Sequence, residues 1–345
     1  MRKTQSQTEF GLLPTMIGSL PHTNAKAACA LVARYLPELP AWPQLPRRSH
    51  QEGMVAQCSE GFPGAAVTEE RFIVEPGPSV EAGLERLYQA YLDNRPDDYA
   101  ISPARAAGLY ALAQTKGLSP AGVKGQLCGP VTFGLTVKDS SGKAIIYNEI
   151  LVDATVKLLT MKAKWQESFL SQLSPQTIIF VDEPALAAYG SAYLTLSKEK
   201  VSSLLAEVLA GISGLSGIHC CGNTDFSLLM AAGIDILSFD AYGYGRSLAV
   251  YPEAVTDFIM SGGAIAWGIV PSDEKDIANE TAASLKDRLE EAMAPFTRHG
   301  VDFHRLVRQG LITPSCGLAG ASVDAAERAL ELCAELSVLM RKRYR

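Results

Sequence analysis

The chain has 345 residues, of which 47% are hydrophobic, and a formal net charge of −6. This length suits one large α/β domain or two ordinary ones, and the acidic balance argues against a nucleic-acid surface. No run of about 18 apolar residues occurs, no signal peptide is recognisable, and seven scattered cysteines are not a disulfide framework. We therefore expect a soluble cytoplasmic protein that binds neither nucleic acid nor membrane.

The first part of the chain contains one long irregular stretch. Residues 1–11 are expected to form a flexible tail, residues 12–21 a first strand, and residues 25–36 a helix. Residues 37–78 are rich in Pro and Gly and exceed the length of an ordinary connection. We interpret them as a loop insertion that contains one uncertain strand, and loops of this length often form lids or binding loops.

Beyond this insertion, predicted strands and helices alternate. The predicted strands are 123–128, 177–182, 217–221, 234–240, 264–270 and 311–316, and the predicted helices are 80–94, 103–116, 144–173, 198–212, 224–232, 255–261, 279–299 and 323–341. Largely apolar strands that are each followed by a helix indicate a parallel sheet covered on both faces. Seven such strands and the uncertain one favour a closed (β/α)8 TIM barrel over a doubly wound sheet, with residues 12–345 as a single domain. No G-x-G-x-x-G follows the first strand, which also disfavours a dinucleotide fold.

Reactive side chains gather where these predicted strands end. They are Ser19, Asp182, Glu183, His219, Cys221, Asp240 and Cys316. In TIM barrels the active site lies at the carboxyl ends of the strands. The pattern therefore predicts one site built from several strand ends.

A metal site is the sharpest hypothesis for part of this group. His219 and Cys221 are two apart on a strand and share a face, while Cys220 points to the other face. Cys316 ends another apolar run just before a Gly, and one imidazole with two thiols is a zinc-ligand set. The alternative is a buried core histidine with cysteines that act as small hydrophobic residues. The local pattern does not decide between them.

The chemistry of such a zinc site is restricted. An ion with one neutral imidazole and two thiolate ligands is formally neutral and activates water poorly, but it suits a soft substrate thiol. Coordination would ionise that thiol at neutral pH, so that it can attack a methyl carbon. Asp240 is either a displaceable oxygen ligand, a helix cap or a surface carboxylate. Asp182 is expected to hold a substrate ammonium group, and Glu183 either does the same or caps backbone amides. The other five cysteines are assigned to packing.

Several motifs resemble known families. The run from His219 to Thr224, followed by residues 236–240, resembles the zinc strand of corrinoid:coenzyme M methyltransferases. Motifs similar to the C-terminal catalytic half of cobalamin-independent methionine synthase are Ile17-Gly18-Ser19, Gly129-Pro130-Val131-Thr132, Asp182-Glu183-Pro184-Ala185-Leu186 and Pro314-Ser315-Cys316-Gly317-Leu318. Both families belong to a barrel superfamily that includes uroporphyrinogen decarboxylase. The resemblance extends from about Pro14 to the C-terminus.

The resemblance implies a zinc site beside a homocysteine site. Its metal ligands would be His219, Cys221 and Cys316, with Asp240 where methionine synthase has a Glu ligand. Its homocysteine-binding residues would be Ile17, Ser19 and Asp182. On this basis we expect a zinc-dependent methyltransferase that activates a thiol, most of all homocysteine, as a zinc-bound thiolate and methylates it to methionine.

The sequence also departs from the methionine synthase pattern. The additional N-terminal barrel that helps hold polyglutamylated methyltetrahydrofolate is not seen, and Pro271-Ser272-Asp273 stands where a catalytic His is expected. The acidic homocysteine-binding motif is not recognisable in residues 37–78. The methyl donor is therefore open between methylcobalamin, free or on a corrinoid protein, and methyltetrahydrofolate.

Three other functions compete with this prediction. A related enzyme would use coenzyme M or another small thiol as the acceptor. A porphyrin-type decarboxylase would need no metal, and a non-catalytic barrel would only hold zinc or a corrinoid protein. Metal content separates the decarboxylase from the others, and turnover of methylcobalamin with homocysteine separates an enzyme from a binding module.

Overall fold

The computed structural model describes residues 9–68, 72–75 and 77–344. Most of the tail expected at residues 1–11 lies outside these ranges. Of its described part, Phe10 is buried and packs in the inner cluster that also contains Leu39 and Phe180. None of the helices in the described ranges is both long enough and apolar enough to cross a membrane.

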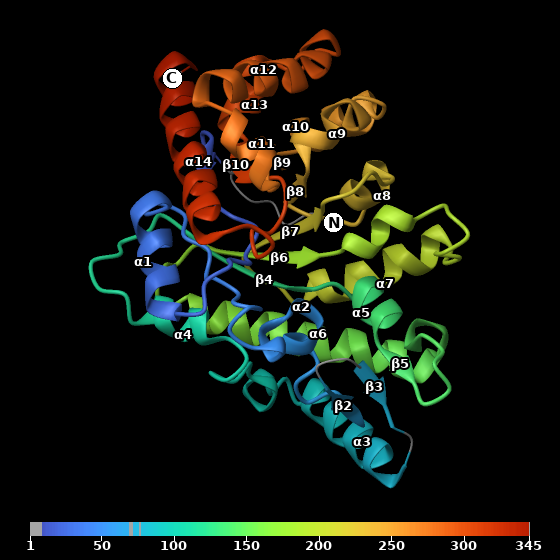
Figure 1. Cartoon of the computed structure of the whole chain (residues 1–345). Helices are drawn as coiled ribbons and strands as arrows, with labels where there is room; N and C mark the ends of the chain where they lie inside the picture. Colours follow the sequence, from blue (N-terminus) through green and yellow to red (C-terminus); the bar gives the residue numbers. More distant parts are fainter. Residues whose placement is uncertain (1–8, 69–71, 76, 345) are drawn as a thin grey trace.

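The core of the fold is a curled parallel sheet of seven strands with helices around it (Figure 1). Its order is β1-β10-β9-β8-β7-β6-β4, and every neighbouring pair is parallel. The strands are β1 (Leu13–Pro14), β4 (Val123–Cys128), β6 (Thr177–Asp182), β7 (Leu215–Cys220), β8 (Ile236–Phe239), β9 (Ala264–Val270) and β10 (Gly310–Pro314). The α/β class and the parallel sheet predicted from the alternating apolar runs are confirmed.

The sheet is less complete than the predicted closed eight-stranded barrel. In the described residues no regular eighth strand joins its two edges, β1 and β4. Instead, an extended segment makes isolated parallel bridges to both sides, Ser19 to Gln44 and Ala41 to Lys124. This segment reads Pro40-Ala41-Trp42-Pro43-Gln44-Leu45-Pro46. Proline has no amide hydrogen to donate, so a strand interrupted in this way cannot form a continuous ladder.

The insertion at residues 37–78 is folded rather than an open loop. It contains η1 (His50–Glu52), α2 (Met54–Cys58), β2 (Ala65–Val67) and β3 (Phe72–Val74). Strands β2 and β3 pair antiparallel, and β3 pairs parallel with β5 (Lys138–Asp139) in a separate small sheet. The uncertain eighth strand of the prediction is therefore replaced by proline-interrupted bridges and this second sheet.

The predicted helices are present, with shifted ends. The helices are α1 (Ala25–Tyr35), α2, α3 (Pro78–Leu92), α4 (Ala107–Ala113), α5 (Pro130–Thr136), α6 (Glu149–Leu170), α7 (Lys198–Ala210), α8 (Phe226–Ala231), α9 (Ala241–Leu248), α10 (Pro252–Met260), α11 (Glu274–Asn279), α12 (Ala282–Arg298), α13 (Phe303–Arg308) and α14 (Val323–Tyr344). Helix α6 starts later than predicted because Asn148 caps it, accepting from the amides of Ile150 and Leu151.

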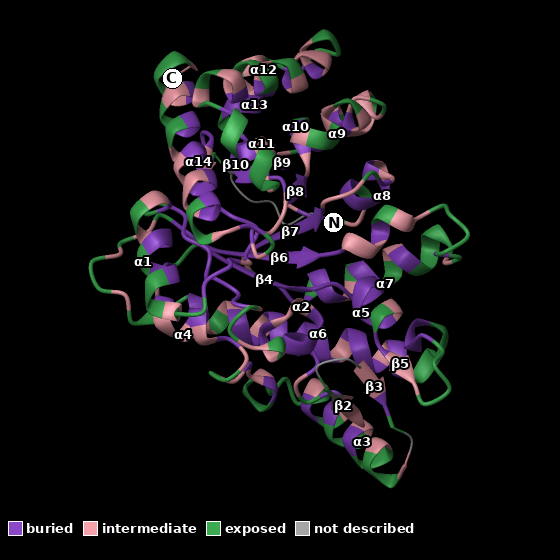
Figure 2. Cartoon of the chain, viewed as in Figure 1, coloured by how far each residue is buried: buried purple, intermediate pink, exposed green. Residues whose placement is uncertain are grey.

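The strands of the sheet and the helix faces packed on them are largely buried (Figure 2), and their side chains form two separate clusters. Side chains inside the curled sheet, such as Ile178, Phe180 and Ala266, form a small inner cluster. Side chains that alternate with them, such as Ile179 and Trp267, belong to the larger layer between the strands and the helices. This alternation decides which strand-end side chains can reach the interior of the sheet.

Candidate active site

One row of side chains crosses the sheet near the carboxyl ends of its strands. Asp182 on β6 is in register with His219 on β7, which is in register with Ser238 on β8. In a parallel sheet, residues in register on neighbouring strands lie side by side on the same face. Asp182 and His219 both line a pocket at this end of the sheet.

The predicted metal ligands come together at this row. The donor atoms of His219, Cys221 and Cys316 all lie within 4.8 Å of one another. The His219 Nδ1 atom is 2.9 Å from the Ser238 hydroxyl, whereas its buried Nε2 has no hydrogen-bond partner in the described residues. A histidine ligand commonly has one ring nitrogen held by a second group while the other faces the metal. The three side chains therefore fit a divalent metal that takes nitrogen and sulfur ligands.

The two thiols of this group differ in their ionisation. The adjacent Cys316 side chain, and then that of His219, lower the pKa of the Cys221 thiol to about 4, although burial opposes them. The nearby Cys221 side chain, together with burial, raises the pKa of Cys316. These opposite directions favour a thiolate at Cys221 beside the neutral thiol of Cys316. The neighbouring Cys220 packs in the outer core, as its opposite direction on the strand predicts.

The metal-ligand group forms part of the wall of a pocket of about 280 Å³. The wall consists of Ile17, Ser19, Gln44, Pro46, Glu52, Met54, Asp182, Pro184, His219, Cys221, Cys316 and Gly317. Eight of these lie in the motifs recognised in the sequence, and the other four, Gln44, Pro46, Glu52 and Met54, come from the insertion. A β-carbon at Gly317 would lie 2.2 Å from the Ser19 hydroxyl oxygen, so a larger residue there would displace this hydroxyl from its position in the pocket.

Asp182 presents a carboxylate with spare hydrogen-bonding capacity. The side chain is 5% exposed, and its Oδ1 atom has no partner in the described residues. Burial raises its pKa to about 6, while the charges of Lys124 and His219 act to lower it. A buried acceptor without a partner costs free energy, so this oxygen is suited to a donor supplied by a ligand.

Glu183, the next residue, faces away from the pocket and has a structural role. Its carboxylate accepts hydrogen bonds from the amides of Val131 and Thr132 and from the Thr132 hydroxyl, at 2.6–2.8 Å. These amides belong to the first turn of α5, and Gly129 leaves the room for this approach, since a β-carbon there would lie 2.2 Å from Glu183. The sequence left Glu183 two roles, binding a substrate ammonium group or capping backbone amides. Its contacts are those of a cap on the amides of Val131 and Thr132, and it does not line the pocket.

Asp240 also acts as a cap. It is the N-cap of α9 and accepts from the Gly243 amide at 2.7 Å. Burial raises its pKa, and repulsion from Cys221 contributes, so the carboxylate lies near the metal-ligand group. It is not a member of the group of three whose donor atoms lie within 4.8 Å.

Glu52 is a pocket residue that the sequence motifs do not identify. Its side chain is fully buried; Oε1 pairs with Arg48, and Oε2 has no partner in the described residues. Burial raises its pKa, and Arg48 acts in the opposite direction. The residue sits in a short 3-10 turn with no periodic pattern around it. The one feature of the sequence that could have identified Glu52 is its acidic side chain within a long insertion, and this feature alone is weak evidence for a role in a site.

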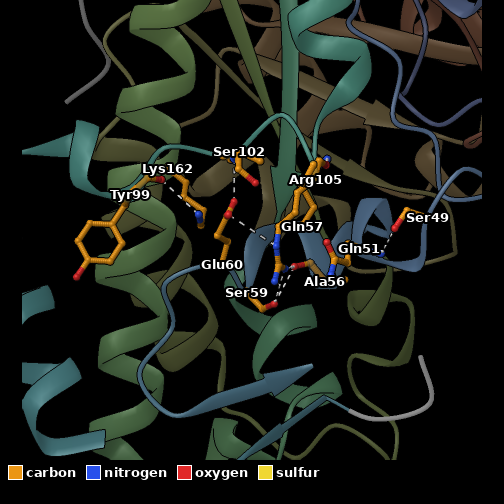
Figure 3. Close-up of polar contacts among 12 residues, drawn as sticks. Ser49, Gln51, Ala56, Gln57, Ser59, Glu60, Tyr99, Ser102, Arg105 and Lys162 are labelled. Carbon is orange, nitrogen blue, oxygen red and sulfur yellow. Dashed lines mark hydrogen bonds and ion pairs between the residues drawn. The ribbon is translucent and has the colours of Figure 1, made fainter. Parts of the chain in front are cut away.

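Side-chain contacts hold the insertion against the pocket. The Gln44 amide donates to Gln57 at 2.9 Å, and Arg47 donates to the Gly320 carbonyl at 2.9 Å. Behind them, Gln57 donates to the Arg105 carbonyl, part of the polar cluster drawn in Figure 3. The position of Glu52 therefore depends on tertiary contacts from several parts of the chain.

Comparison with known proteins identifies relatives by structure alone. No family model and no curated protein matches the sequence. A B12-independent methionine synthase from Shewanella sp. W3-18-1, solved in complex with selenomethionine, superposes with a TM-score of 0.62 at 17% identity, over 96% of this chain and 98% of that one. This chain has the fold of that protein.

Two further solved structures agree. A methyltransferase from Methanosarcina mazei matches with a TM-score of 0.56 at 15% identity, over 94% of this chain and 87% of that one. A putative vitamin-B12 independent methionine synthase from Listeria monocytogenes matches with a TM-score of 0.54 at 12% identity, over 93% and 86%. At these identities the likeness is one of fold, and it agrees with the resemblance drawn from the sequence motifs.

Proposed function

We propose that this protein is a zinc-dependent methyltransferase that methylates a thiol, with homocysteine as the acceptor and methionine as the product. The observation that carries the proposal is the convergence of one imidazole and two thiols within 4.8 Å, on the wall of a pocket that also presents two buried carboxylates. In this proposal the fold is a (β/α)8 barrel in which the extended segment at residues 40–46 takes the place of the eighth strand.

The donor set supports zinc over harder metals. His219, Cys221 and Cys316 supply one nitrogen and two sulfurs, which zinc accepts and which magnesium or calcium do not prefer. When bound there, zinc would supply a soft Lewis acid that ionises an incoming thiol at neutral pH. Ser238 would keep the imidazole in the orientation that leaves Nε2 available. We retain Asp240 as a weaker, displaceable oxygen ligand in the proposal.

The carboxylates support an acceptor that carries an ammonium group. Asp182 Oδ1 and Glu52 Oε2 are both buried pocket oxygens without a partner in the described residues. An amino-acid thiol would satisfy them with charge-assisted hydrogen bonds, while Ile17 and Ser19 line the wall available to its carboxylate. Coenzyme M would instead bring a sulfonate toward two carboxylates. The pocket therefore favours homocysteine among small thiols.

Methylcobalamin, free or on a corrinoid protein, is the methyl donor that we propose. The N5 amine of methyltetrahydrofolate leaves poorly unless it is protonated, whereas cob(I)alamin departs without taking up a proton. After β9, Ser272 pairs with the Ser315 hydroxyl, and Asp273 caps α11 by accepting from the Lys275 amide. Neither Ser272 nor Asp273 is therefore positioned to protonate a folate leaving group.

The test is turnover of the zinc-loaded protein with each donor. At saturating homocysteine we expect methionine to form faster from methylcobalamin than from methyltetrahydrofolate. A clear preference for the folate would show that another group supplies the proton and that the corrinoid proposal is wrong. An absence of methionine with both donors, in protein that retains zinc, would favour the non-catalytic binding function.

A further inference from the structure

A second hollow lies outside the sheet, between two helices. Helices α9 and α12 pack against each other and against β9, in the upper part of Figure 1. The groove that they enclose has a volume of about 490 Å³, and Ile269 on the outer face of β9 belongs to its wall. Its wall shares no residue with the pocket at the metal-ligand group. The proposed reaction therefore gives this groove no role.

Small residues keep the groove open. Helix α9 contributes Gly243, Gly245 and Ala249 to its wall, and α12 contributes Ala292 and Ala294. A β-carbon on Gly245 would already lie 3.5 Å from the Ala292 β-carbon, so a longer side chain at either position would occupy the groove. The volume that remains is in the range of pockets that hold small organic molecules.

The polar part of the wall is mainly cationic. Arg246 from α9 faces the same groove as Arg288 and Arg298 from α12, and Glu291 is the one acidic residue on the wall. The whole chain, in contrast, has a net charge of −6. A concave surface with a local excess of positive charge attracts anions more strongly than a flat one.

Arg288 is held in place by its neighbours. Its Nε atom is 2.9 Å from Glu280 Oε1, and its guanidinium carbon is 4.7 Å from the centre of the Tyr242 ring. The Tyr242 hydroxyl donates to the same Glu280 oxygen at 3.0 Å. A guanidinium has five N–H donors, so its pairing with one carboxylate leaves donors for a second anion. Arg288 is therefore a fixed cation on the groove wall.

The other two arginines are only weakly engaged. Arg246 is 3.5 Å from Glu291, and both side chains are largely exposed, so this ion pair contributes little. Arg298 makes no hydrogen bond or ion pair within the described residues. Both lie in the last turns of their helices, where a cation interacts favourably with the helix dipole. That effect does not explain why they line one groove together with Arg288.

We propose that the groove between α9 and α12 binds a small organic anion that carries at least two phosphate or carboxylate groups. Arginines on both helices can each pair with one such group, and the guanidinium fork matches phosphate and carboxylate alike. The small residues between them leave room for the body of the ligand. This inference does not depend on the proposed function, because no residue of the groove is assigned to methyl transfer.

The experiment is calorimetric titration of the zinc-loaded protein, at about 0.15 M salt, with pyrophosphate and with tricarballylate. The first probe carries phosphate groups and the second carries three carboxylates. We expect at least one of them to bind the wild type with a Kd below about 1 mM. Arg246→Gln and Arg298→Gln should each weaken that binding by about fivefold, and the double variant by about 20-fold.

Arg95→Gln is the matched control. It removes the same charge from an exposed arginine at the start of η2 (Pro96–Tyr99), which does not line the groove. This variant should bind both probes as the wild type does. Glu291→Gln is a second test that keeps every arginine. It removes the carboxylate that competes for Arg246, so it should tighten binding by about threefold.

Three results would overturn the site. The first is that neither probe binds the wild type. The second is that the double variant binds a probe as the wild type does, because an anion bound at the zinc or elsewhere would not respond to these arginines. The third is an equal loss in Arg95→Gln, which would mean a general attraction of anions to the protein. Weaker binding in Glu291→Gln would contradict the site in the same way.

The two probes also separate the possible sources of the ligand. Tighter binding of pyrophosphate than of tricarballylate would identify a phosphate-bearing molecule, and the reverse order would identify a polycarboxylate. Either order supports the site, provided that the arginine variants lose the binding. Urea unfolding of the same variants measures the contribution of the arginines to helix stability, so a purely structural role would lower stability without any anion binding to lose.

Discussion

The two walls of the pocket are built by different means. On one side, Asp182 and His219 lie on neighbouring parallel strands, and backbone hydrogen bonds of the ladder set their separation. On the other side, Glu52 lies in a 3-10 turn of an irregular segment that side-chain contacts such as that of Arg47 with the Gly320 carbonyl hold in place. The strand wall contains the metal-ligand group, and the insertion wall adds a carboxylate.

This difference matches the precision that each task needs. Zinc ligands must be held to within a few tenths of an ångström, which favours strand ends over loops. An ammonium group accepts a wider range of directions, so a carboxylate on a less regular segment can serve it. The walls should therefore respond differently to substitution, and the variants below test that.

The largest effect is expected at the metal ligands of the strand wall. Cys221→Ser and Cys316→Ser each remove a thiolate, so zinc should fall from about one equivalent per chain to a small fraction of that. Metal analysis of the purified proteins measures this. Cys220→Ala is the control, because its side chain packs in the outer core and should leave the zinc in place. A full equivalent of zinc in either serine variant would show that the assignment is wrong.

The outward face of the same strand end should matter for stability rather than for binding. Glu183→Ala leaves two amides and a hydroxyl of Val131 and Thr132 without their acceptor, and we expect a loss of about 3 kcal/mol in the free energy of unfolding. Asp182→Asn should cost less than this, because its Oδ1 has no hydrogen-bond partner to lose and only the charge interaction with Lys124 is removed. Urea unfolding compares the two variants. Equal losses would contradict the division between the faces.

The carboxylates of the two walls should contribute unequally to acceptor binding. Asp182→Asn should weaken homocysteine by about 10- to 100-fold and a thiol without the amine much less. Glu52→Gln should have a smaller effect, of about threefold to tenfold, because Arg48 already neutralises part of its charge. Titration of each variant with both thiols measures this. An effect of Glu52→Gln larger than that of Asp182→Asn would reverse the proposed order of the walls.

The smallest effect is expected behind the insertion wall. Lys162 on α6 is fully buried and donates to the Tyr99 carbonyl at 3.3 Å. Burial lowers the pKa of Lys162 to about 8 from 10.5. Below pH 8 both the folded and the unfolded chain carry the proton, and the folded state bears the full cost of the buried charge. From pH 8 to 10.5 the unfolded state binds more protons than the folded one, so this residue makes stability rise with pH.

Lys162→Met should therefore stabilise the protein by about 1 kcal/mol at pH 7, and the gain should disappear as the pH approaches 10.5. Urea midpoints of variant and wild type at pH 7 and at pH 10 provide the measurement. A gain that does not change with pH would mean that the charge is not its cause. A variant less stable at pH 7 would show that the contact with Tyr99 outweighs the cost of burial.

The amino-acid sequence by itself determined the regular parts of this protein. Continuous apolar runs specified the strands that end at Asp182 and Cys220, because a strand covered on both faces has no polar alternation. The spacing of His219 and Cys221 specified a shared face, because side chains on a strand repeat every two residues. The same rule separates Cys221 from Cys220. These are local properties, and they needed no knowledge of the neighbouring strands.

Only the tertiary structure decided the other features. Prolines in residues 40–46 prevent a regular eighth strand. The two isolated bridges that this segment makes instead depend on where the edge strands β1 and β4 lie in the folded sheet. Glu183 is a cap because α5 presents its amides to it, and Glu52 reaches the pocket because contacts with Arg105 and Gly320 hold the insertion there. Such contacts join residues that are distant in the chain. No local pattern encodes them, since they depend on where separate elements meet after the sheet has formed.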